Sequence, residues 1–193
     1  MTIFDDRLRS PKHLAFFEKL TSRHWWTADD YWDVPDELVV EIYDGGIHVV
    51  PSASPDHQFV AGDIYLALRA AIPEKRRVIM DVDVNVLGKI YKPDVLVVKE
   101  PTNLQPIPGD LLQVVVEVIS QNENIERTAK KAAYAAQGIP LYIVVDGKQG
   151  THFAEIYRLN GAEYERQATV SADAKTEFAE PFPFVLDMKQ INS

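Results

Sequence analysis

The spacing of apolar positions changes along the chain, and each spacing predicts a secondary structure. Residues 54–72 carry apolar side chains at near-helical intervals, which predicts an amphipathic helix capped by Ser54 or Asp56. The alanine-rich residues 124–138 predict a second helix, and Gly138 is the glycine expected just after its last turn. Both segments therefore predict helices that cover a sheet.

Strands are predicted where apolar residues alternate with polar ones or run continuously. Residues 78–87 alternate valine with aspartate and asparagine, which is typical of a half-buried strand. Two hairpins are predicted at Asp44-Gly45-Gly46 and Asn160-Gly161, because tight turns favour these residues. The other predicted strands are residues 91–100, 111–120 and 141–146, with an extended edge segment at residues 180–188.

The order of these elements predicts an α/β fold, a mixed β-sheet flanked by helices and supplemented by β-hairpins. The strand at 111–120, the alanine-rich helix and the strand at 141–146 form a βαβ unit, whose two strands are parallel. No internal repeat or Gly/Ser linker divides the chain. We therefore expect an N-terminal arm or short helix over residues 1–23, one domain over residues 24–188 and a tail over residues 189–193.

Glu117 interrupts one of the most apolar segments of the chain. Seven of the ten residues 111–120 are apolar, and a carboxylate buried among them requires a partner. If this strand pairs antiparallel with the preceding one, Asp94 lies close to Val115 or Glu117. Two adjacent carboxylates repel each other. Such a pair persists if a cation joins the two groups, if one group stays protonated, or if a basic side chain lies nearby.

The predicted helix at 124–138 offers a basic partner, and Mg²⁺ is a suitable cation. Glu126, Lys130 and Tyr134 are spaced by four residues and share one face of that helix. Lys130 can therefore reach the strand end, whereas Lys131 points about 100° away. Mg²⁺ prefers one or two carboxylates together with water and substrate phosphate.

Composition and charge limit the possible functions. The 193 residues are 46% apolar and 25% charged, which is typical of a globular domain. The chain contains no cysteine, which excludes disulfides, thiolate metal sites and a cysteine nucleophile. Because no signal-like or membrane-length apolar run is present, we expect a cytoplasmic protein. The net charge of −9 counts against strong unassisted DNA binding, but it is compatible with acidic metal ligands.

Several segments together resemble a known family. KPDVLVV, VVVEVIS and ERTAKKAAYAAQGIPLYIVVD are similar to the Uma2-like restriction endonucleases of the PD-(D/E)XK nuclease superfamily, as are WWTADDYWDVP, VEIYDGGIHVVPSASPDHQ and PFPFVLD. The resemblance covers roughly residues 24–188. It implies a restriction-endonuclease-like fold and hydrolysis of DNA phosphodiester bonds with Mg²⁺ or Mn²⁺.

The resemblance also implies roles for individual residues. Asp94 and Glu117 match the two metal-binding acids. Ile119 stands where the superfamily pattern has a lysine. In this family the lysine is relocated to the following helix, so Lys130 is the best match for the lysine that assists the water or the transition state. Glu41 matches a further acidic position that would hold a second metal or an outer-shell water. Two other positions depart from the family pattern, Glu126 where Asp is frequent and Gly46 where Glu is frequent.

Other conspicuous side chains have structural interpretations. His57, in the first turn of its helix, could face the cleft, but a capping or surface role is expected in preference. The Trp25-Trp26 pair is expected to anchor packing, although such rings also stack on bases. The basic residues 74–77 are interpreted first as a solvated turn and second as a phosphate contact.

Three functions follow from these observations. The first is a metal-dependent endonuclease that acts on duplex DNA as a homodimer, whose two-fold symmetry matches that of the duplex. The second is a catalytically weak or inactive nuclease-fold protein that acts as a binding module, which the acidic charge favours. The third is a glycosidase with Asp94 and Glu117 as acid and base, although nothing beyond scattered aromatic residues suggests a sugar cleft.

Overall fold

The computed structural model describes residues 10–119, 125–148 and 151–192, except for the side chains of residues 125–127 and 148. The chain forms two compact units. The first unit comprises Met1–Pro51 and Gly88–Tyr91, and the second comprises Ser52–Leu87 and Lys92–Ser193. In the described residues, no helix is long and apolar enough to cross a membrane.

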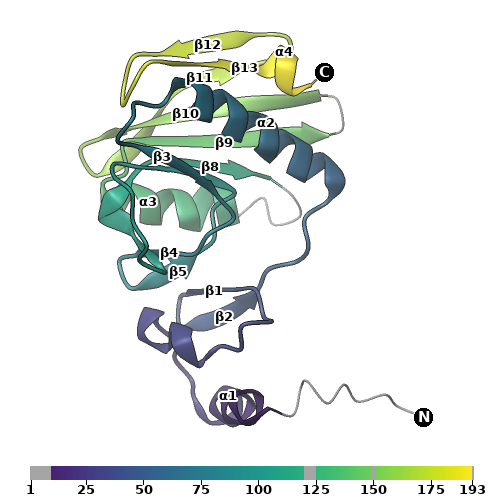
Figure 1. Ribbon diagram of the computed structural model, residues 1–193, viewed down its shortest axis with the longest axis vertical. Helices are drawn as coiled ribbons and strands as arrows, with labels where there is room; N and C mark the ends of the chain where they lie inside the picture. Colours follow the sequence, from purple (N-terminus) through teal and green to yellow (C-terminus); the bar gives the residue numbers. More distant parts are fainter. Residues whose placement is uncertain (1–9, 120–124, 149–150, 193) are drawn as a thin grey trace. The chain divides into compact units, whose positions relative to one another are not determined.

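The first unit is built from a small antiparallel sheet and two short helices (Figure 1). Its hairpin turns at Asp44 and Gly45, which both have positive φ, so the predicted hairpin is confirmed. The buried cluster of this unit includes Phe16, Trp26 and Ile42. The elements are α1 (Pro11–Ser22), the 3₁₀ helix η2 (Ala28–Asp33), β1 (Val40–Tyr43), β2 (Gly46–Val49) and β5 (Lys89–Tyr91).

The second unit contains a six-stranded mixed sheet in the order β11-β10-β9-β8-β6-β3. β8 and β9 are parallel neighbours joined through α3, so the predicted βαβ unit is confirmed. The remaining neighbours in this sheet are antiparallel. The strands are β3 (Arg77–Met80), β6 (Val95–Val98), β8 (Leu112–Val118), β9 (Leu141–Lys148), β10 (Thr151–Asn160) and β11 (Glu163–Val170).

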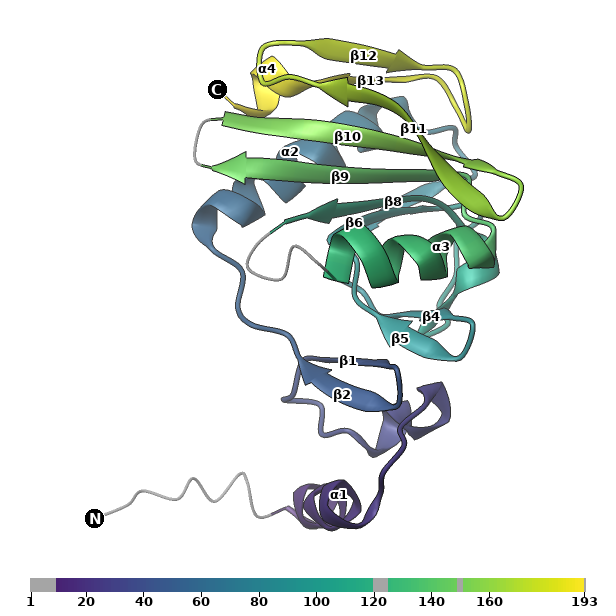
Figure 2. The same cartoon turned by 180° about the vertical axis from the view of Figure 1, so that it is seen from behind.

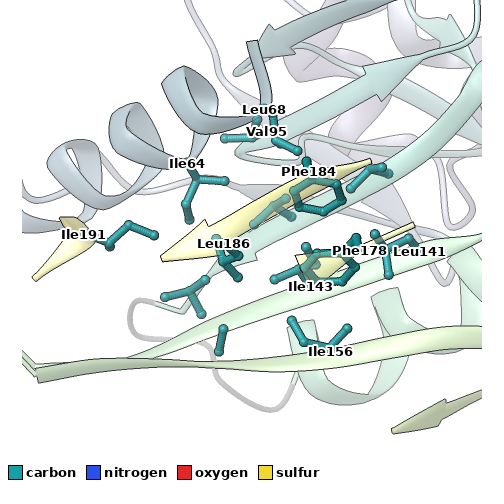
Figure 3. Packing of buried hydrophobic residues seen from close by; sticks show 14 of the residues in the cluster. Ile64, Leu68, Val95, Leu141, Ile143, Ile156, Phe178, Phe184, Leu186 and Ile191 are labelled. Atoms are coloured by element: carbon teal, nitrogen blue, oxygen red, sulfur yellow. The ribbon is translucent and has the colours of Figure 1, made fainter. Parts of the chain in front are cut away.

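Helices cover both faces of this sheet, with α2 (Pro55–Ala71) on one face and α3 (Lys131–Gln137) on the other (Figures 1 and 2). The hairpin of β12 (Lys175–Phe178) and β13 (Phe184–Asp187) packs on the α2 side with the short helix α4 (Met188–Ile191). Figure 3 shows Ile64 and Leu68 of α2 together with Phe184 and Leu186 of β13 in the main core. The α2 face of the sheet is therefore mostly apolar, and buried polar side chains lie on the other face and at the strand ends.

The predicted strand at residues 78–87 is wrong as a single element. It divides into β3, which ends at Met80, and β4 (Val84–Val86), which pairs in parallel with β7 (Ile107–Pro108). Asp81 lies at the break with φ of +54°, a left-handed conformation that aspartate adopts more readily than most residues. The predicted strand at 91–100 is likewise divided, since Tyr91 ends β5, Pro93 cannot donate to a sheet, and β6 begins only at Val95.

The predicted helix at residues 124–138 begins differently from expectation. A π-helical turn, η4 (Ile125–Lys130), precedes the α-helical residues of α3. The end of the helix is as predicted, since Gly138 has φ of +85° and its N–H donates to the carbonyl of Ala135. In the second hairpin Asn160 pairs with Glu163, so the turn lies at Gly161-Ala162, one residue later than predicted.

Gly109 lies where α3 approaches the loop that follows β4. A Cβ at this position would lie 2.7 Å from Gln137 Oε1 and 2.8 Å from the carbonyl oxygen of Asn85. Gln137 Oε1 also accepts a hydrogen bond from Leu87 N at 3.1 Å. Gly109→Ala is therefore expected to lower the free energy of unfolding by about 1–3 kcal/mol, measured by urea denaturation.

Gly62→Ala is the control for this substitution. Nothing lies within 4 Å of a Cβ at Gly62, so alanine there is expected to stabilise the helix. Equal stability of Gly109→Ala and the wild type would contradict the prediction.

Candidate active site

Two carboxylates occupy neighbouring positions where β6 begins and β8 ends. Val95 pairs with Val116, and the next residue outward on each strand is Asp94 or Glu117. Val116 belongs to the apolar core on the α2 face, so alternation directs Glu117 to the opposite face. Asp94 stands just before β6, where strand alternation does not apply. Asp94 Oδ2 accepts a hydrogen bond from Val118 N at 2.6 Å. The predicted antiparallel pairing and the predicted proximity of the two segments are confirmed.

Glu117 is held by two donors from the helical segment that follows β8. Lys130 Nζ lies 3.2 Å from Glu117 Oε2, and the Tyr134 hydroxyl donates to Oε1 at 2.7 Å. Glu117 is 2% exposed and Lys130 is 4% exposed. Lys130 therefore reaches the strand end as its spacing predicts, and it meets Glu117 as a buried, charge-assisted pair.

A group of tyrosines fixes the position of Tyr134. Its ring packs edge-on against Tyr142 of β9, with centroids 5.4 Å apart. Tyr142 in turn stacks on Tyr157 and Tyr164. Burial raises the pKa of Tyr164, whose hydroxyl donates to the carbonyl of Ile139 at 2.8 Å. Because Tyr134 is packed in this way, its hydroxyl presents a fixed donor to Glu117.

Asp94 contacts the first turn of α2. Ser54 caps this helix, and its hydroxyl accepts from His57 N at 3.2 Å. The His57 ring is buried, and its Nε2 lies 3.2 Å from Asp94 Oδ1. Burial opposes protonation of the ring, but the Asp94 carboxylate and the charge of Asp81 outweigh this effect and raise the pKa of His57 above 6.5. The expected surface role of His57 is therefore wrong, and the capping role belongs to Ser54.

The turn between β3 and β4 supports the backbone of Asp94. Asp81 N donates to the carbonyl of Asp94 at 3.2 Å. Lys92 Nζ donates to the carbonyl of Asp81 at 2.6 Å and lies 3.3 Å from Asp81 Oδ1 and 3.8 Å from Asp83 Oδ1. Lys92 therefore offsets the negative charges of Asp81 and Asp83 in the turn that contacts the backbone of Asp94.

The donor set fits Mg²⁺ or Mn²⁺ bound by two carboxylates. Within the described part of the chain, no three His, Asp or Glu side chains are grouped as an all-protein metal cage. Asp94 and Glu117 are hard oxygen donors, and Mg²⁺ is usually bound by one or two carboxylates with several waters. A carboxylate offers about four lone-pair sites, so it can bind a cation while it also accepts hydrogen bonds. These two residues therefore fit a hydrated cation.

The other side chains singled out in the sequence have the following surroundings. Glu41 lies on β1 in the first unit, is 7% exposed and stands opposite His48; its role remains a prediction. Trp26 packs against Phe16 as an anchor, as predicted, whereas Trp25 is 65% exposed. In the basic segment, Arg77 donates to two carbonyls of its own turn, which agrees with a turn. The side chain of Glu126 lies outside the described residues.

Sequence reasoning missed two functional candidates, His57 and Tyr134. The spacing of Tyr134 four residues after Lys130 placed both on one face, but no role followed for the tyrosine. Nothing in the spacing around His57 indicates Asp94 as its partner, because this contact depends on how α2 lies on the sheet. A buried histidine at a helix start is visible only in three dimensions.

Comparisons with known proteins find a matching family model and a solved structure of similar fold. A family model named Uma2 and described as "Putative restriction endonuclease" matches residues 28–189. Among solved structures, the chain is similar to one described as "a putative nuclease belonging to DUF820 from Anabaena variabilis", with a TM-score of 0.66 and 18% sequence identity. That match covers 86% of this chain and 97% of the other. No curated protein matches the chain. The predicted restriction-endonuclease-like α/β fold is confirmed.

Proposed function

The chain belongs to the Uma2 family, and on this premise we propose that it is a metal-dependent endonuclease that hydrolyses phosphodiester bonds in DNA. The observation that carries this proposal is the arrangement of Asp94, Glu117 and Lys130 at one end of adjacent strands. Two carboxylates can hold a cation for phosphodiester hydrolysis, and an ammonium group can stabilise the charge that grows on the phosphate.

The site residues have separable tasks in this proposal. Asp94 and Glu117 would hold the metal, which when bound polarises the phosphate and lowers the pKa of a coordinated water. Lys130, 3.2 Å from Glu117, orients that water or stabilises negative charge growing on the phosphate. Tyr134 fixes the second oxygen of Glu117. Glu41 is proposed to hold a second metal or an outer-shell water.

The substrate proposed is duplex DNA, cut by a homodimer. Two copies related by a two-fold axis would present one site to each strand of the duplex. The net charge of −9 opposes contact with phosphates, so a bound cation is expected to contribute both to catalysis and to substrate affinity. DNA binding is therefore expected to be weak in the presence of a chelator.

Cleavage of supercoiled plasmid by the wild-type protein tests the proposal directly. We expect nicking in the presence of Mg²⁺ or Mn²⁺ and none with a chelator. Because a ligand that binds only the folded state stabilises it by about 2.7 kcal/mol at a hundredfold excess over Kd, the metal should also raise the Tm. A protein that binds neither ion by calorimetry and cuts no plasmid would refute the proposal.

A binding module is the second candidate function. It is favoured by the acidic charge and by the 2% exposure of Glu117, because a metal ligand must be reached by water and substrate. This candidate predicts binding of a partner without turnover. Size-exclusion chromatography and filter binding to DNA and RNA, with and without Mn²⁺, separate it from the nuclease. Metal-dependent product formation excludes it as the whole function.

A further inference from the structure

The first turn of α2 is joined to the sheet by two adjacent residues. His57 Nε2 lies 3.2 Å from Asp94 Oδ1, beside β6. Asp56 Oδ2 lies 3.1 Å from Nε2 of His152 on β10, at ion-pair distance but outside hydrogen-bond geometry. Successive residues of a helix point about 100° apart. The two pairs therefore hold the same turn in two directions, but only one of them contacts a carboxylate of the proposed metal site.

Both oxygens of Asp94 are fixed by groups of this unit. Oδ2 accepts the 2.6 Å hydrogen bond from Val118 N, in the residue that follows Glu117. Oδ1 contacts His57, whose ring is buried. A carboxylate held on both oxygens keeps one orientation, and an oriented carboxylate binds a cation without losing further rotamer freedom.

The geometry also limits how His57 can act. Its Nε2 contacts Asp94, and its Nδ1 is buried with no hydrogen-bond partner among the described residues. The contact through which His57 reaches the proposed metal site is therefore the one from Nε2 to Asp94 Oδ1.

We propose that His57 is a positioning residue that holds Asp94 in the orientation in which this carboxylate binds the divalent metal. The inference rests on the proposed function and adds helix α2 to the metal site. The inference gives His57 a different role from the neighbouring Asp56–His152 pair, which anchors the same turn without contacting Asp94. The metal site is then assembled from two strands, α3 and the first turn of α2.

Calorimetric titration with Mn²⁺ tests this role in three variants of the full chain. His57→Leu removes the donor to Asp94 and is expected to weaken Mn²⁺ binding by about ten- to a hundredfold, the usual effect of losing an outer-shell partner. His57→Gln keeps an N–H donor at a position similar to Nε2 and should recover most of the affinity. His152→Leu breaks the other pair and should leave the Mn²⁺ affinity within about twofold of wild type.

The outcomes show whether His57 orients Asp94 or only anchors the first turn of α2 to the sheet. Wild-type affinity in His57→Leu would overturn the inference, as would equal losses in His57→Leu and His152→Leu, which would indicate that only the anchoring of the turn matters. If His57→Leu fails to fold, His57→Asn takes its place with the same expected loss, because its shorter amide does not reach Asp94 as Nε2 does. If the wild-type protein binds no Mn²⁺, the proposed function itself is refuted. If the wild-type protein binds Mn²⁺ and His57→Leu binds it equally well, only the inference about His57 is refuted.

Discussion

Glu117→Gln is expected to abolish detectable Mn²⁺ binding and plasmid cleavage. The amide keeps the volume of the side chain and an acceptor oxygen for Tyr134 or Lys130, but it removes the negative charge that a cation requires. Loss of an outer-shell partner alone costs about 10–100-fold in metal affinity, so loss of a ligand is expected to exceed about a hundredfold. Calorimetry with Mn²⁺ and plasmid cleavage, performed on the same preparation, measure both effects.

The control for Glu117→Gln is another buried glutamate of the same sheet. Glu155 on β10 is 7% exposed and accepts a hydrogen bond from Arg166 at 2.9 Å. Glu155→Gln removes one carboxylate from the sheet without changing the proposed site, so Mn²⁺ affinity and cleavage should remain at the wild-type level. Unchanged Mn²⁺ affinity in Glu117→Gln would show that Glu117 is only a structural partner of Lys130.

The parts of the site that were predicted from sequence are those encoded in short segments. Glu117 stands out because its neighbours on β8 are apolar, and the antiparallel register of two consecutive strands then places Asp94 beside it. Lys130 followed from helical spacing, and its contact with Glu117 survives the π-helical turn that precedes α3. In each case the partner is close in sequence or follows from one strand pairing.

The features that were not predicted depend on backbone conformation or on distant packing. Alternating valines at residues 78–87 report which side chains are apolar, but not that Asp81 turns the chain with positive φ. For His57 a capping or surface role was preferred to a position facing the cleft. Its burial against Asp94 results from the packing of α2 on the sheet, which involves segments far apart in the chain.

The tyrosine group next to the site both stabilises the buried Glu117–Lys130 pair and orients the Glu117 carboxylate. Tyr134 is fully buried and donates to Glu117, and the rings of Tyr142, Tyr157 and Tyr164 fill the space behind it. Polar groups that are buried and satisfied rigidify their surroundings. The same contacts that make the Glu117–Lys130 pair tolerable inside the protein therefore also determine where the carboxylate points.

Lys130→Met separates catalysis from metal binding. Methionine keeps most of the apolar volume of the side chain but has no charge, so the carboxylates retain their affinity for a cation while the phosphate loses a positive donor. Removal of one such donor typically lowers kcat by about 10²–10³-fold. We therefore expect Mn²⁺ affinity at or above the wild-type value and cleavage reduced by about that factor, measured by calorimetry and by single-turnover cleavage of plasmid.

Stability adds a second readout for the same variant. Removing one partner of a buried ion pair typically costs about 3–5 kcal/mol, and with a chelator Lys130→Met should lose free energy of unfolding of that order. Saturating Mn²⁺ should restore part of it, because the ion replaces the positive charge beside Glu117. Lys131→Met is the matched control, since Lys131 lies over the ring of Tyr157 at 3.8 Å and takes no part in the proposed site. Wild-type turnover in Lys130→Met would show that Lys130 is only a structural counter-ion of Glu117.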